Sequence, residues 1–440
     1  MLLGAAFAAA LGGFLFGFDT IVISGCQDQL KMLFHLSVFE QGFMTASALI
    51  GASIGALAAA KPADKHGRRD CLRVAAAFYF ICALGCGLSG NFWPFVAFRL
   101  VGGLAVGATT VLCPMYLAEI SPAEWRGRLV AFFQFNVVLG CLMAVVSNYL
   151  FGRLELGATE WRWKLGIQAL PALTFFVLLF LVPRSPRWLV MKGAYDEAAA
   201  VLLATGAMDV DEQIATIQRS VRDSIKGASV PFFVQANFKP IFLACTVGFF
   251  NQFDGINALW YYLNPIFSMA GFTKLSGDLQ SVLLGAVNLI ATIVGMAAID
   301  RVGRKPLLLW GAIGTAAWMG LLAWIFNGPR HHDWLIWLLA GFVICHAFGQ
   351  GAVVWVYISE VFPNAVRSKG QTAASFTVWF SAIVISWAFP MVAKEAGQPN
   401  AGLPFAFFAV MMVVQTIVVW FFFPETKSVS LEEMQRRLAS

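Results

Sequence analysis

Twelve long apolar stretches run through this chain of 440 residues, and they constrain its fold more than any other feature. Each approaches or exceeds the roughly 20 mostly apolar residues that an α-helix needs to cross a bilayer. Hydrophobic residues make up 59% of the chain, charged residues only 12%, and the mean hydropathy is +0.74, which a water-soluble domain does not carry. The sequence therefore predicts an all-α membrane protein with twelve transmembrane helices, at about 2–24, 40–60, 72–89, 93–117, 129–151, 163–182, 239–269, 279–299, 306–326, 334–357, 370–393 and 402–423.

Two charged segments repeat in the second half of the chain. One is Asp64-Lys-His-Gly67-Arg68-Arg69, which returns as Asp300-Arg-Val-Gly303-Arg304-Lys305. The other is Tyr116-x-x-Glu119-x-x-Pro122-x-x-x-Arg126, which returns at nearly the same offset as Tyr357-x-x-Glu360-x-x-Pro363-x-x-x-Arg367. Internal duplication of this kind is typical of an alternating-access transporter, in which one helix bundle moves against the other around a central site.

The duplication predicts two pseudo-symmetric six-helix bundles, at 1–183 and 239–424, with a cytoplasmic helical linker at 184–238 and a cytoplasmic tail at 425–440. In the linker, apolar residues recur at helical spacing, which predicts short amphipathic helices. A plain linker is the alternative interpretation. The residues that carry this pattern are Ala198, Val201, Leu202, Ile214, Ile217, Val221 and Ile225.

Positive charge predicts the orientation of the chain. With the N-terminus inside, 22 of the 30 Lys and Arg residues fall in cytoplasmic segments and seven on the opposite side, as expected because positively charged loops stay in the cytoplasm. We therefore expect a multi-pass protein of the plasma (inner) membrane, embedded in the lipid bilayer, with both termini cytoplasmic. The net charge of +6 reflects this bias and indicates no nucleic-acid partner.

The repeated segments contain carboxylates, glycines and arginines in the same order. Gly67 and Gly303 allow a tight reversal between two antiparallel helices. Anchoring at the membrane surface explains the signs of the charges but not the repeated order. We therefore expect bidentate carboxylate–guanidinium pairs that form a cytoplasmic gate, closed when the transporter is open to the outside and broken for inward opening. Its residues are Asp64, Arg68, Arg69, Glu119, Arg126, Asp300, Arg304, Glu360 and Arg367.

Two ionisable residues lie inside predicted spans, Asp19 in the first and Arg99 in the fourth. With a helical rise of about 1.5 Å per residue, they lie at nearly the same depth and are able to pair. Burial disfavours a charged carboxylate and a neighbouring cation favours it, so a change in their separation would drive proton uptake or release. The sequence thus predicts proton coupling, and a static ion pair between two helices is the alternative.

A group of amide side chains lies in spans 5, 7 and 8. Amides both donate and accept hydrogen bonds, as sugar hydroxyls do, and aromatic faces can pack on the C–H face of a pyranose. Amides that only join helices are the alternative. Gly255 among them predicts a locally broken span 7, and no role is assigned to the neighbouring Asp254. The candidate substrate-binding residues are Phe16, Gln134, Asn251, Gln252, Asn257, Tyr261, Asn288, Trp355 and Trp379.

No nucleophile with an adjacent base and no cluster with metal-ligand spacing occurs in the predicted spans. The eight cysteines are scattered without disulfide or metal-ligand spacing. We therefore expect neither an enzyme nor a cofactor or metal site.

Several ordered motifs make the chain resemble the sugar porter family of the major facilitator superfamily over residues 12–434. The resemblance implies twelve helices in two bundles with a monosaccharide bound between them, and it implies sugar contacts at Gln134, Gln252, Asn257, Asn288 and Trp355. Asp19 stands where proton-coupled members tend to carry aspartate. The motifs are Gly13-Phe-Leu-Phe-Gly17-Phe-Asp19, Arg99-x-x-Gly102-Gly103, Pro114-x-Tyr116-x-x-Glu119-Ile-Ser-Pro122, Ser185-Pro-Arg-Trp-Leu189, Asn251-Gln-Phe-Asp-Gly-Ile-Asn257, Trp355-Val-Tyr-Ile-Ser-Glu360 and Pro424-Glu-Thr-Lys427.

The chain also departs from the family pattern at several positions. Asn251 replaces a usual glutamine, Ala352 a common proline, and Val378 a side chain that often forms hydrogen bonds, so recognition of one hydroxyl should weaken. Arg184 stands where the family usually has a glutamate after Pro183.

These observations predict a monomeric, proton-coupled symporter that imports a hexose or pentose. The alternatives are an uncoupled facilitative sugar transporter, a polyol or inositol transporter and, from another class, a sugar sensor that does not transport.

Overall fold

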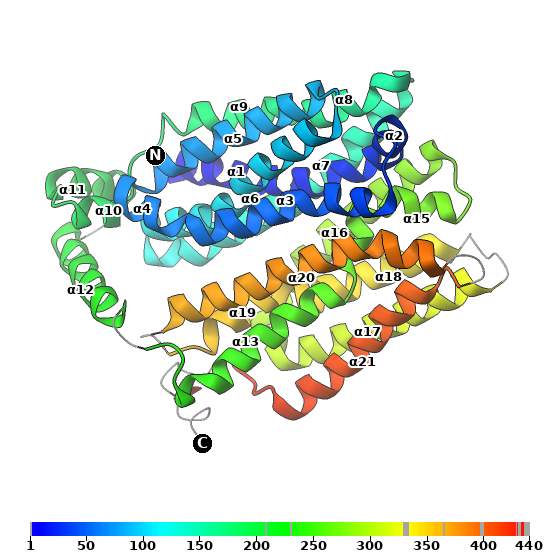
Figure 1. The fold of residues 1–440 in the computed structure, drawn as a ribbon. Coiled ribbons are helices and arrows are strands. Elements are labelled where there is room, and N and C mark those ends of the chain that lie inside the picture. The colour runs from blue at the N-terminus through cyan, green and yellow to red at the C-terminus, as the bar shows by residue number, and fades with distance from the viewer. Residues whose placement is uncertain are drawn as a thin grey trace. The chain divides into compact units, whose positions relative to one another are not determined.

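The structure is a computed structural model that describes residues 2–206, 209–228, 231–328, 334–363, 366–396, 400–427, 429 and 433–434. Every regular element in these residues is a helix, which confirms the all-α prediction (Figure 1). The first half of the chain forms α1 (Leu2–Val22), η1 (Ile23–Cys26), α2 (Gln27–Leu33), α3 (Val38–Ala58), α4 (Ala60–His66), α5 (Arg68–Leu88), α6 (Phe92–Ile120), α7 (Ala123–Arg153), η2 (Gly157–Thr159), α8 (Glu160–Gly166) and α9 (Ala169–Leu178). The linker and second half form α10 (Pro186–Met191), α11 (Tyr195–Ala204), α12 (Val210–Ala228), α13 (Gln235–Phe253), α14 (Ile256–Tyr261), α15 (Leu263–Met269), α16 (Lys274–Val302), α17 (Arg304–Asn327), α18 (Leu335–His346), η4 (Ala347–Gly351), α19 (Ala352–Glu360), α20 (Arg367–Ala396) and α21 (Leu403–Phe422).

Ten helical stretches of the described chain are long and apolar enough to cross a membrane. The other two predicted spans, 163–182 and 239–269, are each interrupted. The first breaks between α8 and α9, because Pro171 has no N–H to donate to the carbonyl of Ile167 four residues earlier. The N–H of Leu170 bonds to that carbonyl instead, at 3.1 Å, in the tighter i→i+3 pattern.

The second interrupted span breaks twice. Gly255 has a φ of 93° in the left-handed region, which ends α13 and confirms the predicted break. Pro265 then leaves the carbonyl of Tyr261 without its helical donor. The side-chain Nε2 of Gln27 donates to that carbonyl at 3.4 Å, so the first residue of α2 satisfies the backbone group that the break frees.

The described chain divides into two compact units. Unit 1 comprises Met1–Val22, Ser47–Ala144 and Gly157–Ser229, and unit 2 comprises Ile23–Ala46, Val145–Leu156 and Val230–Ser440. Unit 2 thus includes η1 and α2, the start of α3 and the end of α7 from the first half of the chain. Within it, the carbonyl of Trp387 on α20 lies so close to Gly42 on α3 that no Cβ fits there.

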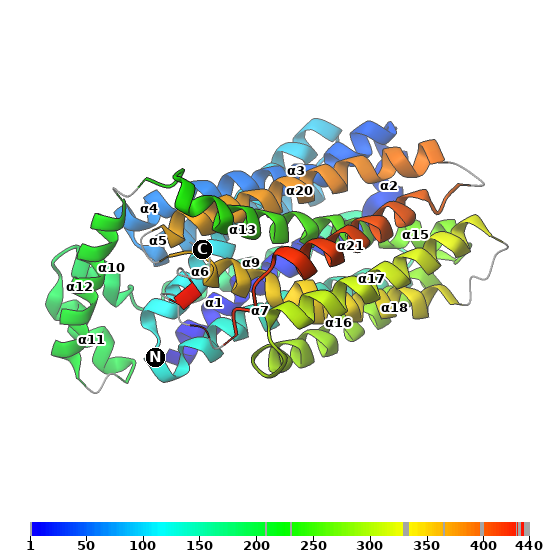
Figure 2. The ribbon, with the colours of Figure 1, turned by 90° about the horizontal axis from the view of Figure 1, so that it is seen from below.

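Glycines allow close helix packing in unit 1. α3 and α6 bring their backbones into contact where Gly51 faces the carbonyl of Leu100 and Gly107 faces the carbonyl of Ala52. Small residues at the interface between membrane helices allow this close approach. Figures 1 and 2 show that in unit 2 α13 runs beside α20 and α17 beside α21.

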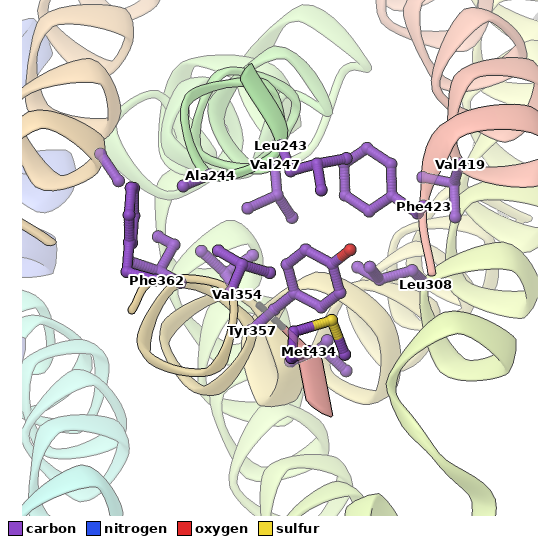
Figure 3. Close-up of a cluster of buried hydrophobic side chains, with 14 of the residues drawn as sticks. Leu243, Ala244, Val247, Leu308, Val354, Tyr357, Phe362, Val419, Phe423 and Met434 are labelled. Carbon is purple, nitrogen blue, oxygen red and sulfur yellow. The ribbon is translucent and has the colours of Figure 1, made fainter. Parts of the chain in front are cut away.

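A core of buried apolar side chains joins α13, α17, α19 and α21 in unit 2. Tyr357 lies at its centre, with its ring stacked at 5.1 Å on Phe423 (Figure 3). Large apolar residues such as Leu181 in unit 1 and Trp310 and Phe421 in unit 2 are exposed. A surface of this kind suits lipid rather than water.

The linker forms three helices that bury part of the predicted apolar pattern, whereas the side chain of Ile225 lies outside the described residues. α10, α11 and α12 bury a small core of their own, which includes Trp188, Ala198 and Val201, with Ile214 and Ile217 packed against it. The indole Nε1 of Trp188 donates to the carbonyl of Asp64 at 3.2 Å, which attaches this group to the rest of unit 1.

Candidate functional sites

An ion pair lies inside unit 1, between α1 and α6. The guanidinium of Arg99 donates to Asp19 Oδ1 at 2.8 Å, and the two side chains are 1% and 3% exposed. Their predicted equal depth thus corresponds to a direct contact. Tyr79 from α5 is buried and shares a hydrogen bond of 3.1 Å with Thr109 on α6. The ion pair of Asp19 and Arg99 is therefore enclosed by packed helices. Each of these buried charges needs the other as its partner, because an unpaired buried charge is strongly destabilising.

The other two unit 1 candidates, Phe16 on α1 and Gln134 on α7, are both partly buried. Their helices touch through backbone atoms, because Gly17 faces the carbonyl of Val137 and Gly140 faces the carbonyl of Phe14. This close approach places Phe16 and Gln134 on adjoining helices of one unit.

In unit 2 three amide candidates form a hydrogen-bonded chain across the break of span 7. Gln252 Nε2 donates to Asn251 Oδ1 at 2.6 Å, and Asn257 Nδ2 donates to Gln252 Oε1 at 2.5 Å. Asn251 and Gln252 are on the last turn of α13 and Asn257 is on the first turn of α14. The left-handed Gly255 turns the chain between them, so the break itself brings the three amides together.

The remaining candidates of unit 2 lie on α14, α16, α19 and α20. Asn288 on α16, Tyr261 on α14 and Trp379 on α20 are buried, whereas Trp355 on α19 is 47% exposed. α16 packs on α19, and α14 on α20. The roles of these four residues as sugar ligands stay predictions.

One departure from the family pattern has a structural counterpart. Val378 on α20 is buried, and its side chain packs against Gly248 on α13. An apolar helix contact therefore occupies the position where a hydrogen-bonding side chain is common.

The first repeated charge cluster, which we call the unit 1 latch, centres on Arg68. Its guanidinium lies 3.1 Å from Asp64 and 3.0 Å from Glu119, and it donates to the carbonyl of Ala63 at 3.0 Å. The hydroxyl of Ser185 donates to Glu119 at 2.6 Å. The latch thus joins α4, α5, α6 and the start of α10.

The second cluster, the unit 2 latch, centres on Arg304. It lies 3.1 Å from Asp300 and donates to Glu360 through two nitrogens, at 3.1 and 2.9 Å, which is the predicted bidentate geometry. The hydroxyl of Thr426 donates to Glu360 as well. Gly67 and Gly303, with φ of 93° and 105°, make the predicted reversals before the two arginines.

Arg69 differs from the expectation that it pairs with the repeated carboxylates. It lies 3.4 Å from Asp70 and donates to the carbonyl of Val182 at 3.2 Å. Successive helical residues point about 100° apart, so when Arg68 faces α6 its neighbour faces elsewhere. Arg367 at the start of α20 is partly buried and interacts with a neighbouring group, and the side chain of Arg126 lies outside the described residues.

The expectations from sequence did not include Ser185 and Thr426 in the latches. A signal was present, because the offset between these two residues equals the offset between Glu119 and Glu360. They also missed His346 on α18, whose Nδ1 lies 2.5 Å from Asp254 Oδ2, and no repeated spacing links those two residues.

Comparisons with known proteins agree with this arrangement. The chain superposes on the xylose transporter XylE from E. coli, in its partially occluded inward open conformation, with a TM-score of 0.87 at 32% identity, over 98% of this chain and 99% of the other. It therefore has the major facilitator fold and is a multi-pass membrane transporter rather than an enzyme.

The family model described as "Sugar (and other) transporter" matches residues 5–438, and the chain belongs to this family. It is 34% identical to the glucose transport protein of Synechocystis sp., over 97% of this chain and 95% of that protein. It is 34% identical to the D-xylose-proton symporter of Escherichia coli, over 97% and 94%. It is 33% identical to the arabinose-proton symporter of Bacillus subtilis, over 98% and 93%.

Proposed function

We propose that this protein is a proton-coupled symporter that imports a monosaccharide, a hexose or a pentose, by alternating access. It acts in the plasma (inner) membrane with both termini in the cytoplasm. The observation that carries the proposal is the ion pair between Asp19 and Arg99, which is almost fully enclosed within unit 1. Ionisable groups at such depth are costly and are functional by default.

The pair supplies a simple proton switch. A proton that binds the Asp19 carboxylate neutralises it and removes the ionic attraction to Arg99, so the charge no longer ties α1 to α6. Release of that proton on the cytoplasmic side restores the pair. Coupling requires that Asp19 bind the proton with different affinity in the outward-facing and inward-facing conformations.

The amide chain of unit 2 supports a neutral polyhydroxyl substrate. Asn251, Gln252 and Asn257 offer donors and acceptors close together, and a sugar ring presents neighbouring hydroxyls that both donate and accept. Relatives named for glucose, xylose and arabinose transport support the same substrate class.

Uptake into proteoliposomes with an imposed inward proton gradient tests the proposal. Radiolabelled D-glucose, D-xylose and L-arabinose are the probes, with unlabelled polyols and inositol as competitors. We expect the wild-type protein to accumulate one of the three sugars against its gradient. We expect Asp19→Asn to abolish uphill accumulation while sugar exchange without a proton gradient continues.

Asp28→Asn is the matched control, because it makes the same change at an exposed position of α2. Uphill accumulation that survives Asp19→Asn would refute the coupling. Passive uptake by the wild-type protein would identify a facilitator, and stronger competition by inositol than by any sugar would replace the proposed substrate class.

A further inference from the structure

A second buried ionisable pair lies in unit 2, at the break of span 7. Asp254 follows the last residue of α13 and is fully buried, and its Oδ2 lies 2.5 Å from Nδ1 of His346, which is 12% exposed and ends α18. Its other oxygen, Oδ1, accepts from the backbone N–H of Ile256 at 2.9 Å. One carboxylate therefore holds the start of α14 and the end of α18 together.

Both elements that the pair joins are irregular, and both continue into candidate substrate residues. The break at Gly255 separates Gln252 from Asn257, and their hydrogen bond spans it. On the other side, His346 is followed by the π-helical turn η4, which leads into α19 and Trp355. Single π turns often occur at functional sites. The position of Asn257 relative to Gln252 thus depends on how firmly Asp254 holds the N–H of Ile256.

The elements packed around the pair carry other charged residues, mostly at the ends of long helices. In the described parts of the helices packed around it, every other charged residue lies within five positions of a helix end. These residues are Lys239 on α13, Lys274, Asp278, Asp300 and Arg301 on α16, Arg304 and Lys305 on α17, Glu360 on α19, and Arg367, Lys369, Lys394 and Glu395 on α20. The uncharged titratable residues of the neighbouring elements are Cys26 on η1, Cys245 on α13, Tyr261 and Tyr262 at the end of α14, Cys345 on α18 and Tyr357 on α19.

Histidine is the side chain that ordinarily changes charge near physiological pH. With one proton between them, Asp254 and His346 attract each other and the carboxylate remains a strong acceptor for Ile256. A second proton converts the pair to a neutral carboxyl and an imidazolium. That form loses the ionic attraction and weakens the bond to Ile256, because hydrogen bonds to a charged acceptor are the stronger ones.

We propose that Asp254 and His346 form a second proton-binding site, distinct from Asp19 and Arg99, that positions the broken helix and makes sugar affinity depend on pH. The proposal rests on the proposed function to the extent that the amides beside the break bind the sugar. Asp254 and His346 are positioning residues, since they act on the substrate through α14. Uptake of the second proton lowers affinity.

The experiment measures the Kd of D-xylose and D-glucose for the purified, full-length protein between about pH 4 and pH 8, a range that spans the ordinary pKa values of aspartate and histidine side chains. It uses an Asp19→Asn background, which removes the first proton site. We expect this variant still to lose affinity toward acid pH, on the order of tenfold, as expected when a charge-assisted hydrogen bond is weakened. Adding Asp254→Asn together with His346→Gln, which removes both titratable groups, should flatten the profile, whereas adding His66→Gln, at an exposed histidine, should leave it unchanged.

A flat profile in the Asp19→Asn background, or a sloping one that survives the combined Asp254→Asn and His346→Gln changes, would overturn the proposal. A second readout needs no sugar. Infrared difference spectra should show a carboxylic-acid band that grows as the pH falls and is absent from Asp254→Asn, and a spectrum without that band would also overturn it. If neither sugar binds but the band titrates, D-xylose and D-glucose are excluded as substrates while the proton site stands.

Discussion

The unit 1 and unit 2 latches have the same backbone plan but differ in burial. In both, the arginine after the left-handed glycine also donates to a carbonyl five residues earlier, that of Ala63 for Arg68 and that of Ile299 for Arg304. The glutamate partner is more enclosed in unit 1, where the side chain of Glu119 is 9% exposed, than in unit 2, where that of Glu360 is 26% exposed. The same sequence pattern therefore produces two arginine–glutamate pairs that differ in how far the glutamate is buried.

The latches also differ in the sign of one charge. In unit 2, Glu425 accepts from the backbone N–H groups of Arg304 and Lys305 at 3.0 Å each, and so caps the start of α17. The equivalent position in unit 1, at the offset that relates Glu360 to Glu119, is Arg184, which lies 3.7 Å from Asp70 in the first turn of α5. Each helix start thus has one carboxylate beside it, as the helix dipole favours.

This difference indicates which part of the repeated pattern is free to change. In unit 2 the carboxylate beside the helix start belongs to Glu425, outside the helix, whereas in unit 1 it belongs to Asp70, within the helix. The side chains of Arg184 and Asp70 are both about a third exposed. The arginine–glutamate pair keeps its residues and its order in both units. We therefore expect the enclosed pair to dominate latch stability and the exchanged charges to contribute little.

The largest effect is expected from Glu119→Gln. Removal of one partner from a buried ion pair costs about 3–5 kcal/mol, and the low end applies because Arg68 keeps Asp64. The variant should unfold at a lower denaturant concentration in detergent solution. Spin-label distances between unit 1 and unit 2 should also shift toward the inward-facing state if the latch acts as a gate.

A second variant checks this prediction. Arg126→Ala should shift the same distances if that residue belongs to the gate. An unchanged distance distribution in both Glu119→Gln and Arg126→Ala would refute the gate and leave the latches with a purely structural role.

Glu360→Gln should have the same sign and a smaller effect, about 1–2 kcal/mol in the free energy of unfolding, the range for hydrogen bonds to charged groups. The carboxylate is partly solvated, and Arg304 keeps Asp300. The ratio of the two effects, measured under the same detergent conditions, tests whether burial sets latch strength. A larger loss from Glu360→Gln than from Glu119→Gln would contradict that view.

Features that depend on short stretches of sequence were predictable. Apolar length identified the membrane helices, and glycine identified the reversals at Gly67 and Gly303 and the break at Gly255, since these depend on local chain geometry. Pro171 gave a similar signal for the interruption between α8 and α9, which the predicted continuous span left out.

Features that depend on how helices rotate against one another were not predictable. Arg69 follows Arg68 in the sequence but faces a different neighbour, and only packing decides that. His346 lies 92 residues from Asp254, and neither belongs to a repeated motif. Matching depth made the contact of Asp19 with Arg99 predictable, because both lie in uninterrupted helices.

Variants of Arg184 and Asp70 measure how much the contact between these two side chains contributes to the free energy of unfolding. Arg184→Glu alone places two carboxylates together and should lower the free energy of unfolding by about 0.5–1 kcal/mol, the range of exposed pairs. Arg184→Glu combined with Asp70→Arg should recover only part of this loss, because Asp70 also lies 3.4 Å from Arg69 and 2.7 Å from Arg73. A double-mutant cycle gives the coupling energy directly, and a coupling of zero would mean that the contact between these two side chains contributes nothing.

The smallest effects are expected at the outer carboxylates of the two latches. The side chains of Asp64 and Asp300 are 58% and 82% exposed, and solvent screening reduces such pairs to about 0–1 kcal/mol. Asp64→Asn and Asp300→Asn should therefore change the free energy of unfolding by about 0.5 kcal/mol or less, with the smaller change at the more exposed Asp300. Salt titration provides the check, because any contribution from these carboxylates should vanish at high ionic strength while the loss caused by Glu119→Gln persists. A loss from Asp64→Asn as large as that from Glu119→Gln would show that Arg68 depends on both carboxylates equally, which would remove burial as the property that distinguishes the two latches.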